Sequence, residues 1–114
     1  MLAKKLRLTG KKNFEDVRKN GKLFQSESFG IAFLENNLKD LSRFAFVVSK
    51  KIAADAVQRN RAKRAMSEAI RLFTSEIKEG YDIVFLAKQA VLRKSTEKIM
   101  IEVKNALKDA SLTK

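Results

Sequence analysis

The chain has 114 residues, 45% of them hydrophobic, which is enough for one hydrophobic core and too few for two of ordinary size. Lysine and arginine number 25 against 13 aspartates and glutamates, a formal charge of +12 that favours a polyanionic partner, nucleic acid ahead of an anionic membrane surface. Cysteine and histidine are absent, which excludes thiol, imidazole and disulfide chemistry and argues against a self-contained catalytic site, although carboxylates alone could hold magnesium.

No stretch of the sequence approaches the roughly 20 apolar residues that span a bilayer. The first residues also lack the apolar run of a signal peptide. We therefore expect a cytoplasmic protein with one domain over residues 1–114. Within it, residues 1–10 are expected to form a flexible basic arm and residues 110–114 a tail.

The basic segment over residues 4–22 contains the first predicted helix. Eight lysines and arginines in this segment stand against two acidic residues. Phe14 and Val17 are three residues apart and so share one helix face, while Asn20-Gly21 supplies a stop signal. The pattern predicts a helix over about residues 11–19, followed by a turn.

Two or three strands are predicted next. Residues 28–35 alternate large side chains with mostly small ones, which predicts a strand with one large face, and residues 23–25 are its candidate partner. Residues 43–49 are rich in strand formers and too short for a helix, and we take them as the central strand. Residues 81–87 form another buried strand by the same criteria.

Two longer helices complete the predicted order, α-β-β-β-α-β-α. Asp55-Ala-Val-Gln58 has the form of a capping box, in which Asp55 accepts from the third helical amide and Gln58 reaches back to the cap amide. The helix that begins there should extend to about Phe73, with an apolar stripe packed on the sheet. The stripe consists of Ala62, Ala65, Met66, Ala69, Ile70 and Phe73. A final amphipathic helix from about Thr96 carries Ile99, Val103, Ala106, Leu107 and Ala110.

The helix after Asp55 also has a cationic face. Residues 49–64 contain six basic side chains and one acidic side chain. At about 100° per residue, one set of polar and basic side chains falls opposite the apolar stripe, namely Asn60, Arg61, Lys63, Arg64 and Arg71. Cations lie on both flanks of this face, so two anionic surfaces could be bound at once. The candidate nucleic-acid-binding residues are Lys50, Lys51, Arg59, Asn60, Arg61, Lys63, Arg64 and Arg71.

The chemistry of this face favours RNA over lipid. A guanidinium presents two donors in a planar fork that fits phosphate, and Asn60 could donate to a phosphate or read a base edge. The alternative is a solvated face whose charges only aid solubility. The six cations in residues 49–64 are opposed within that segment only by Asp55, however, and like charges one turn apart repel by a few tenths of a kcal/mol per pair, which an anionic partner would relieve.

The run over residues 49–64 resembles the signature of the bacterial ribonuclease P protein component, whose core is Arg-Asn-Arg-x-Lys-Arg. In this sequence the core is residues 59–64. Further segments match the family in order, and the resemblance covers about residues 5–108. They are Leu6-Arg7-Leu8, Asn13-Phe14, Asn20-Gly21-Lys22, Val47-Val48-Ser49-Lys50-Lys51 and Gly80-Tyr81-Asp82-Ile83-Val84.

The resemblance implies an α+β fold, a single-domain α/β sandwich with a left-handed βαβ crossover, against the general rule of right-handed crossovers. It also implies a ribonucleoprotein endonuclease whose RNA subunit hydrolyses precursor tRNA to make the mature 5′ end. The protein would then bind the 5′ leader and the catalytic RNA without supplying the chemistry. Mg²⁺ would act through the RNA holoenzyme, with no protein site assigned, and neither membrane nor DNA is an expected partner.

Individual roles follow from the resemblance position by position. Arg59, Asn60 and Lys63 match positions that face the leader or the RNA near the cleavage site, whereas Arg61 and Arg64 match positions that face the catalytic RNA. The implied leader cleft contains Phe14, Phe29, Arg18 and Lys88, although Phe14 could equally be a plain core residue. Several positions depart from the family pattern and predict a less aromatic and less basic cleft. They are Arg18, Ala32, Ala54-Asp55, Ser67 and Lys88.

Two other functions fit part of the sequence. A structural ribosomal or nucleoid protein would share the charge and size but does not require the ordered set of motifs. A membrane-surface helix is disfavoured, because the apolar stripe of the helix after Asp55 is built from Ala, Met and Ile that its own core needs and has no Trp.

Overall fold

The computed structural model describes residues 2–36, 38 and 41–114. These described residues form three α-helices and four strands in the predicted order, α-β-β-β-α-β-α. The helices are α1 (Lys11–Asn20), α2 (Ala56–Phe73) and α3 (Thr96–Asp109). The strands are β1 (Lys22–Gln25), β2 (Phe29–Glu35), β3 (Arg43–Val47) and β4 (Tyr81–Ala87). Short 3-10 turns are η1 (Lys4–Leu6), η2 (Thr74–Glu76) and η3 (Gln89–Arg93).

The four strands form one mixed sheet in the order β1-β2-β4-β3. β2 is antiparallel to both β1 and β4, whereas β3 is parallel to β4. β3 is therefore an edge strand and not the central strand we expected from its composition. β3 is nevertheless apolar because side chains pack against both of its faces. Its outer edge is partly paired with the N-terminal segment, since the Leu8 N–H donates to the Phe44 carbonyl at 2.8 Å. Because β3 and β4 are parallel neighbours joined through α2, they form the expected βαβ crossover.

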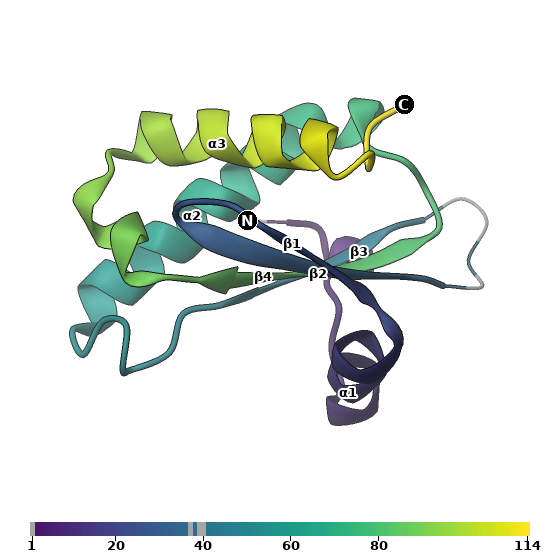
Figure 1. The fold of residues 1–114 in the computed structure, drawn as a ribbon, viewed down its shortest axis with the longest axis horizontal. Helices are drawn as coiled ribbons and strands as arrows, with labels where there is room; N and C mark the ends of the chain where they lie inside the picture. Colours follow the sequence, from purple (N-terminus) through teal and green to yellow (C-terminus); the bar gives the residue numbers. More distant parts are fainter. Residues whose placement is uncertain (1, 37, 39–40) are drawn as a thin grey trace.

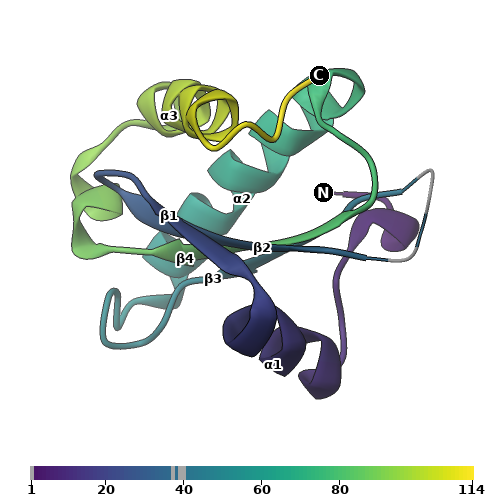
Figure 2. The same cartoon turned by 45° about the vertical axis from the view of Figure 1, so that its right-hand side comes forward.

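The sheet lies between two helical layers, which makes the fold the α/β sandwich that the resemblance implied. α2 and α3 cover one face, and α1 covers the other (Figures 1 and 2). The predicted alternation in β2 is confirmed, because Phe29 and Ile31 point into the core under α2 and α3, while Ala32 faces α1. On that second face, Ala32 of β2 and Ala45 of β3 belong to one buried cluster with Val17 of α1.

The apolar stripe predicted for α2 is confirmed, but its capping box is not. Ala62, Ala65, Met66, Ala69 and Ile70 are all buried, at no more than 1% exposure. The helix is capped by a single contact, in which Asp55 Oδ1 accepts from the amide of Val57 at 2.8 Å. Gln58 does not reach back to the cap, because its Oε1 accepts from Arg61 Nε at 3.2 Å.

Glycine is required at the junction of α1 and β1 by close backbone approach. Gly21 has φ −82°, so its conformation is open to other residues. A Cβ at this position, however, would lie 2.5 Å from the carbonyl oxygen of Val17 and 2.6 Å from that of Phe33. The stop signal predicted at Asn20-Gly21 therefore acts by letting the end of α1 pack directly on β2.

Both ends of the chain pack against the domain. The segment expected to be a flexible arm contains Leu2 and Leu8, both buried, and Arg7 forms a bridge with β3. In the tail, Leu112 is buried and its carbonyl accepts from the amide of Lys78 at 2.8 Å. Isolated buried leucines anchor these segments, and isolated residues produce no periodic pattern in the sequence. Within the described part of the chain, no helix combines the length and apolarity needed to cross a membrane.

Candidate nucleic-acid interface

A cleft with a volume of about 420 Å³ opens beside the outer edge of β3, between the N-terminal segment, α1 and α2. It brings together side chains from segments that are far apart in the sequence. The walls include Arg7, Thr9, Phe14, Phe46, Asn60, Lys63, Arg64 and Ser67. The cleft therefore combines aromatic rings with cationic and amide groups.

α2 contributes the cationic wall. Asn60, Lys63, Arg64 and Ser67 recur at the helical spacing i, i+3, i+4 and i+7, so they form one stripe beside the buried apolar stripe. The side chains of Asn60, Lys63 and Arg64 are all exposed. The predicted separation of an apolar face from a cationic face on this helix is thus confirmed.

Phe14 on α1 belongs both to the core and to the cleft. Its side chain is half-buried and packs against the cluster of Leu8, Val17 and Ala45, yet it also lines the cleft. The two readings that the sequence left open are therefore compatible. One part of the ring supports the fold, and the remainder is available to a ligand.

Phe46, Arg7 and Thr9 line the cleft but are not among the site residues predicted from the sequence. Phe46 on β3 is half-buried, with its ring stacked on Phe85 at a centroid distance of 5.4 Å. Its spacing of two from the buried Phe44 was an available signal that both rings face α2. Arg7 and Thr9 had no such signal, because only the pairing of the N-terminal segment with β3 brings them to the cleft.

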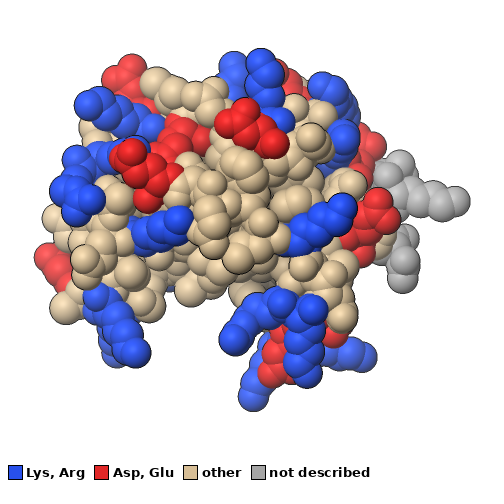
Figure 3. Space-filling view, viewed as in Figure 1, with Lys and Arg blue, Asp and Glu red and all other residues tan. Residues whose placement is uncertain are grey.

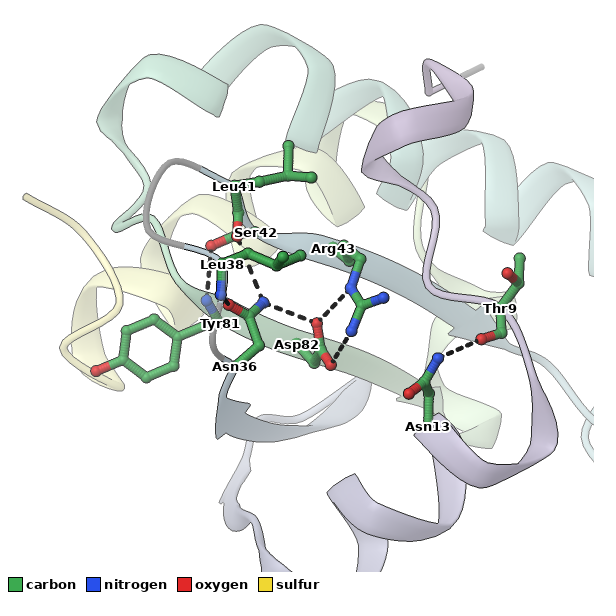
Figure 4. Close-up of polar contacts among 9 residues, drawn as sticks. All are labelled: Thr9, Asn13, Asn36, Leu38, Leu41, Ser42, Arg43, Tyr81 and Asp82. Carbon is green, nitrogen blue, oxygen red and sulfur yellow. Dashed lines mark hydrogen bonds and ion pairs between the residues drawn. The ribbon is translucent and has the colours of Figure 1, made fainter.

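Figure 4 shows polar contacts near the start of α1 and between β3 and β4. Asn13 Nδ2 donates to the Thr9 carbonyl at 2.8 Å, which holds the start of α1 to the N-terminal segment. On the same side of the sheet, Arg43 makes a two-pronged contact with Asp82, Nε to Oδ1 at 2.8 Å and Nη2 to Oδ2 at 2.7 Å. This contact ties β3 to β4 and neutralises the charge of Arg43.

Three of the residues expected in the leader cleft do not line it. Phe29 is fully buried and packs edge-on against Phe85 at a centroid distance of 5.5 Å. It lies on the large face of β2, which α2 and α3 cover, so we correct its assignment to the core. Arg18 is exposed on α1 outside the cleft. Lys88 also lies outside the cleft, and its Nζ donates at 2.7 Å to the carbonyl of Ser26 in the turn between β1 and β2.

A second groove, about 570 Å³ in volume, lies on the other flank of α2, toward the start of α3. Arg61 and Glu68 line this groove, and Arg64 and Ser67 line both the groove and the cleft. The cationic face therefore borders two separate hollows.

Lys50, Lys51 and Arg71, which were also predicted to bind RNA, line neither hollow. Lys50 and Lys51 are exposed on the loop between β3 and α2. Arg71 is exposed on α2 and forms an ion pair with Glu68. Further lysines and arginines gather on α1, which projects from the side of the sheet opposite α3 (Figure 3). Among residues 2–36, 38 and 41–114, no three acidic side chains come together as candidate metal ligands.

Glu102 on α3 anchors the segment that borders the second groove. Its carboxylate accepts from Lys94 Nζ at 2.8 Å, from Ser28 Oγ at 2.7 Å, from the Ser28 amide at 2.8 Å and from Ser26 Oγ. Burial raises the pKa of Glu102, but the hydrogen bonds from Lys94, Ser26 and Ser28 outweigh burial and lower the pKa from 4.5 to about 2.

This cluster predicts an acid-labile contribution to stability. Because the pKa of Glu102 is lower in the folded state, its contribution is complete above about pH 4.5 and is lost as the pH falls toward 2. Glu102→Gln resembles the protonated state, so its deficit in melting temperature should be largest at neutral pH and shrink below pH 4. Thermal melts of both proteins from pH 7 to pH 2 measure this difference. A deficit that stays constant over the whole range would contradict the assignment.

The fold and the site define a small, basic α+β sandwich protein with an aromatic and cationic cleft at the edge of its sheet. A family model described as Ribonuclease P matches residues 2–111. The chain belongs to the ribonuclease P protein family.

Relatives and solved structures agree with this assignment. The chain is 40% identical over 108 residues to the ribonuclease P protein component of Clostridium kluyveri, covering 91% of this chain and 95% of the relative. It is 28% identical to the RNase P protein of Staphylococcus aureus, with a TM-score of 0.88 over 96% of this chain and 98% of that one. The RNase P protein from Thermotoga maritima gives a TM-score of 0.81 at 30% identity, covering 90% and 96% of the two chains.

Proposed function

We propose that this chain is the RNA-binding protein subunit of ribonuclease P, which binds the 5′ leader of precursor tRNA and the catalytic RNA in the cytoplasm. In this role it supports endonucleolytic 5′ maturation of tRNA, and the RNA subunit carries the hydrolytic chemistry. The observation that supports the proposal best is the cleft. It joins Phe14 to Asn60, Lys63 and Arg64, three residues of the family's signature run.

The leader is the ligand that the cleft fits best. A single strand presents unstacked bases, which stack on aromatic faces, and phosphates, which pair with cations. We assign base stacking to Phe14, phosphate contact to Lys63 and Arg64, and contact with a base edge or phosphate to Asn60.

The second groove is assigned to the catalytic RNA. Arg64 borders both hollows, so it can contact either RNA, and Arg61 faces only the second groove. Mg²⁺ is required through the RNA holoenzyme in this proposal, and no protein side chain is assigned to it. Magnesium keeps several waters and is commonly bound by phosphates, which the two RNAs supply.

Arg64→Ala tests the phosphate contact. The Arg64 side chain is exposed, so its removal should leave the fold intact while weakening binding to the RNA subunit. Each lost phosphate contact should reduce the slope of log K against log salt concentration by about 0.7–0.9. Binding titrations at four salt concentrations, with melting temperature as the control, measure both effects. An unchanged affinity at low salt would remove Arg64 from the interface.

A further inference from the structure

We propose that Arg59 and Arg61 are positioning residues, which hold the protein's own backbone, and that Asn60, Lys63 and Arg64 make the contacts with RNA. This inference rests on the proposed function. It divides the residues of the signature run into those that hold the protein backbone and those that contact RNA. The division follows from the hydrogen bonds of each side chain. It could not be read from the sequence, where the three arginines of the run look alike.

Arg59 ties the start of α2 to the loop that precedes it. Its Nη1 donates to the carbonyls of Ala53 and Ala54, each at 2.7 Å. Ala53 is buried, so the contact fixes the loop against the domain. The same loop carries the exposed Lys50 and Lys51, and Arg59 thereby sets where their charges lie relative to α2.

Arg61 ties α2 to the segment that precedes α3. Its three nitrogens donate to three separate acceptors. They are Gln58 Oε1 at 3.2 Å from Nε, the Lys94 carbonyl at 3.0 Å from Nη1 and the Leu92 carbonyl at 3.4 Å from Nη2. Three of its five N–H groups are thus directed into the protein, in a fork that a lysine cannot reproduce.

Lys94, whose carbonyl accepts from Arg61, is itself held in place by ion pairs. The Lys94 ammonium pairs with Glu102 at 2.8 Å and with Glu27 at 2.7 Å. The carbonyl that receives Arg61 therefore belongs to a residue anchored to α3 and to the turn before β2. Arg61 is half-buried in this arrangement, and the wall of the second groove depends on it.

The other members of the run differ in this respect. Within the described part of the chain, no hydrogen bond or ion pair joins the side chains of Asn60, Lys63 or Arg64 to another protein group. All three are exposed, whereas Arg59 and Arg61 are half-buried. Phosphates can approach the free groups without breaking any contact in the protein.

The salt dependence of binding separates positioning from contact. A residue that touches a phosphate contributes about 0.7–0.9 to the slope of log K against log salt, whereas a residue that only orients others contributes little. Arg61→Lys keeps the charge and removes the fork. We expect it to weaken binding to the cognate catalytic RNA about tenfold, through the lost hydrogen bonds, with the wild-type slope retained. Arg64→Lys should bind nearly as wild type, and Arg64→Ala should lower the slope.

Arg59→Lys tests the same proposal independently at position 59. It still distinguishes positioning from phosphate contact if Arg61→Lys does not fold. Each variant is compared at a temperature where circular dichroism shows it to be folded. Positioning predicts weaker binding at an unchanged slope for both lysine variants. If alanine at position 59 or 61 instead lowers the slope as Arg64→Ala does, and lysine restores wild-type binding, the residue contacts phosphate and the proposal fails. Wild-type protein without specific affinity for the catalytic RNA would instead overturn the proposed function.

Discussion

Ala69→Asp is expected to unfold the protein or to lower its melting temperature severely. Ala69 is fully buried on α2, in the stripe that packs against the sheet beside Met66 and Ile70. A carboxylate there has no cationic partner in the core, and burying an unpaired charge costs several kcal/mol. That cost is comparable with the whole stability of a small domain, about 5–15 kcal/mol. Thermal denaturation followed by circular dichroism measures the effect.

Leu72→Asp is the matched control on the same helix. Leu72 is 53% exposed, so the same new charge meets water and should change the melting temperature little. If Ala69→Asp melts cooperatively at the wild-type temperature, the side of α2 that faces the sheet has been assigned incorrectly.

Phe14→Ala is expected to lower the affinity of the reconstituted holoenzyme for precursor tRNA that carries a leader. The loss should reach up to about 1–3 kcal/mol if a base stacks on the ring. Binding of mature tRNA, which lacks the leader, should barely change. Equilibrium binding of the two tRNAs to holoenzymes containing either protein measures the contrast.

Val17→Ala separates the structural part of this effect from the functional part. Truncating a fully buried Phe costs about 3–5 kcal/mol, and the half-buried Phe14 should lose only a fraction of that. Val17 lies on the same face of α1 at 1% exposure and does not line the cleft. Its truncation should lower stability without altering the preference for precursor over mature tRNA. If Phe14→Ala lowers the affinity for precursor and mature tRNA equally, Phe14 has only a structural role in the core.

Local patterns in the sequence are sufficient to predict the helices and strands, and to predict which side chains lie on the apolar and cationic faces of α2. The stripe from Ala62 to Phe73 and the alternation in residues 28–35 each report which side chains share a face, and the structure confirms both. Such patterns cannot report which partner covers a face. The composition of β3 therefore predicts a central strand although β3 lies at the edge of the sheet, and the resemblance, which alone implies a cleft position for Phe29, does not reveal that α2 and α3 bury it.

Long-range contacts account for the rest of the site. Arg7 and Thr9 reach the cleft only because the N-terminal segment pairs with β3. Helical periodicity placed Arg61 on a solvent face, but its acceptors at Leu92 and Lys94 lie more than 30 residues further along the chain. The family resemblance supplied the βαβ arrangement that periodicity could not.

Reconstitution with the cognate catalytic RNA at limiting Mg²⁺ tests the central claim most directly. The proposed function predicts that the wild-type protein accelerates cleavage of precursor tRNA at the mature 5′ end. A Lys63→Ala, Arg64→Ala double variant, folded by circular dichroism, should lose most of that stimulation. Stimulation no greater than that from an unrelated basic protein, with equal affinity for unrelated RNAs, would contradict the account and favour a structural nucleic-acid-binding protein.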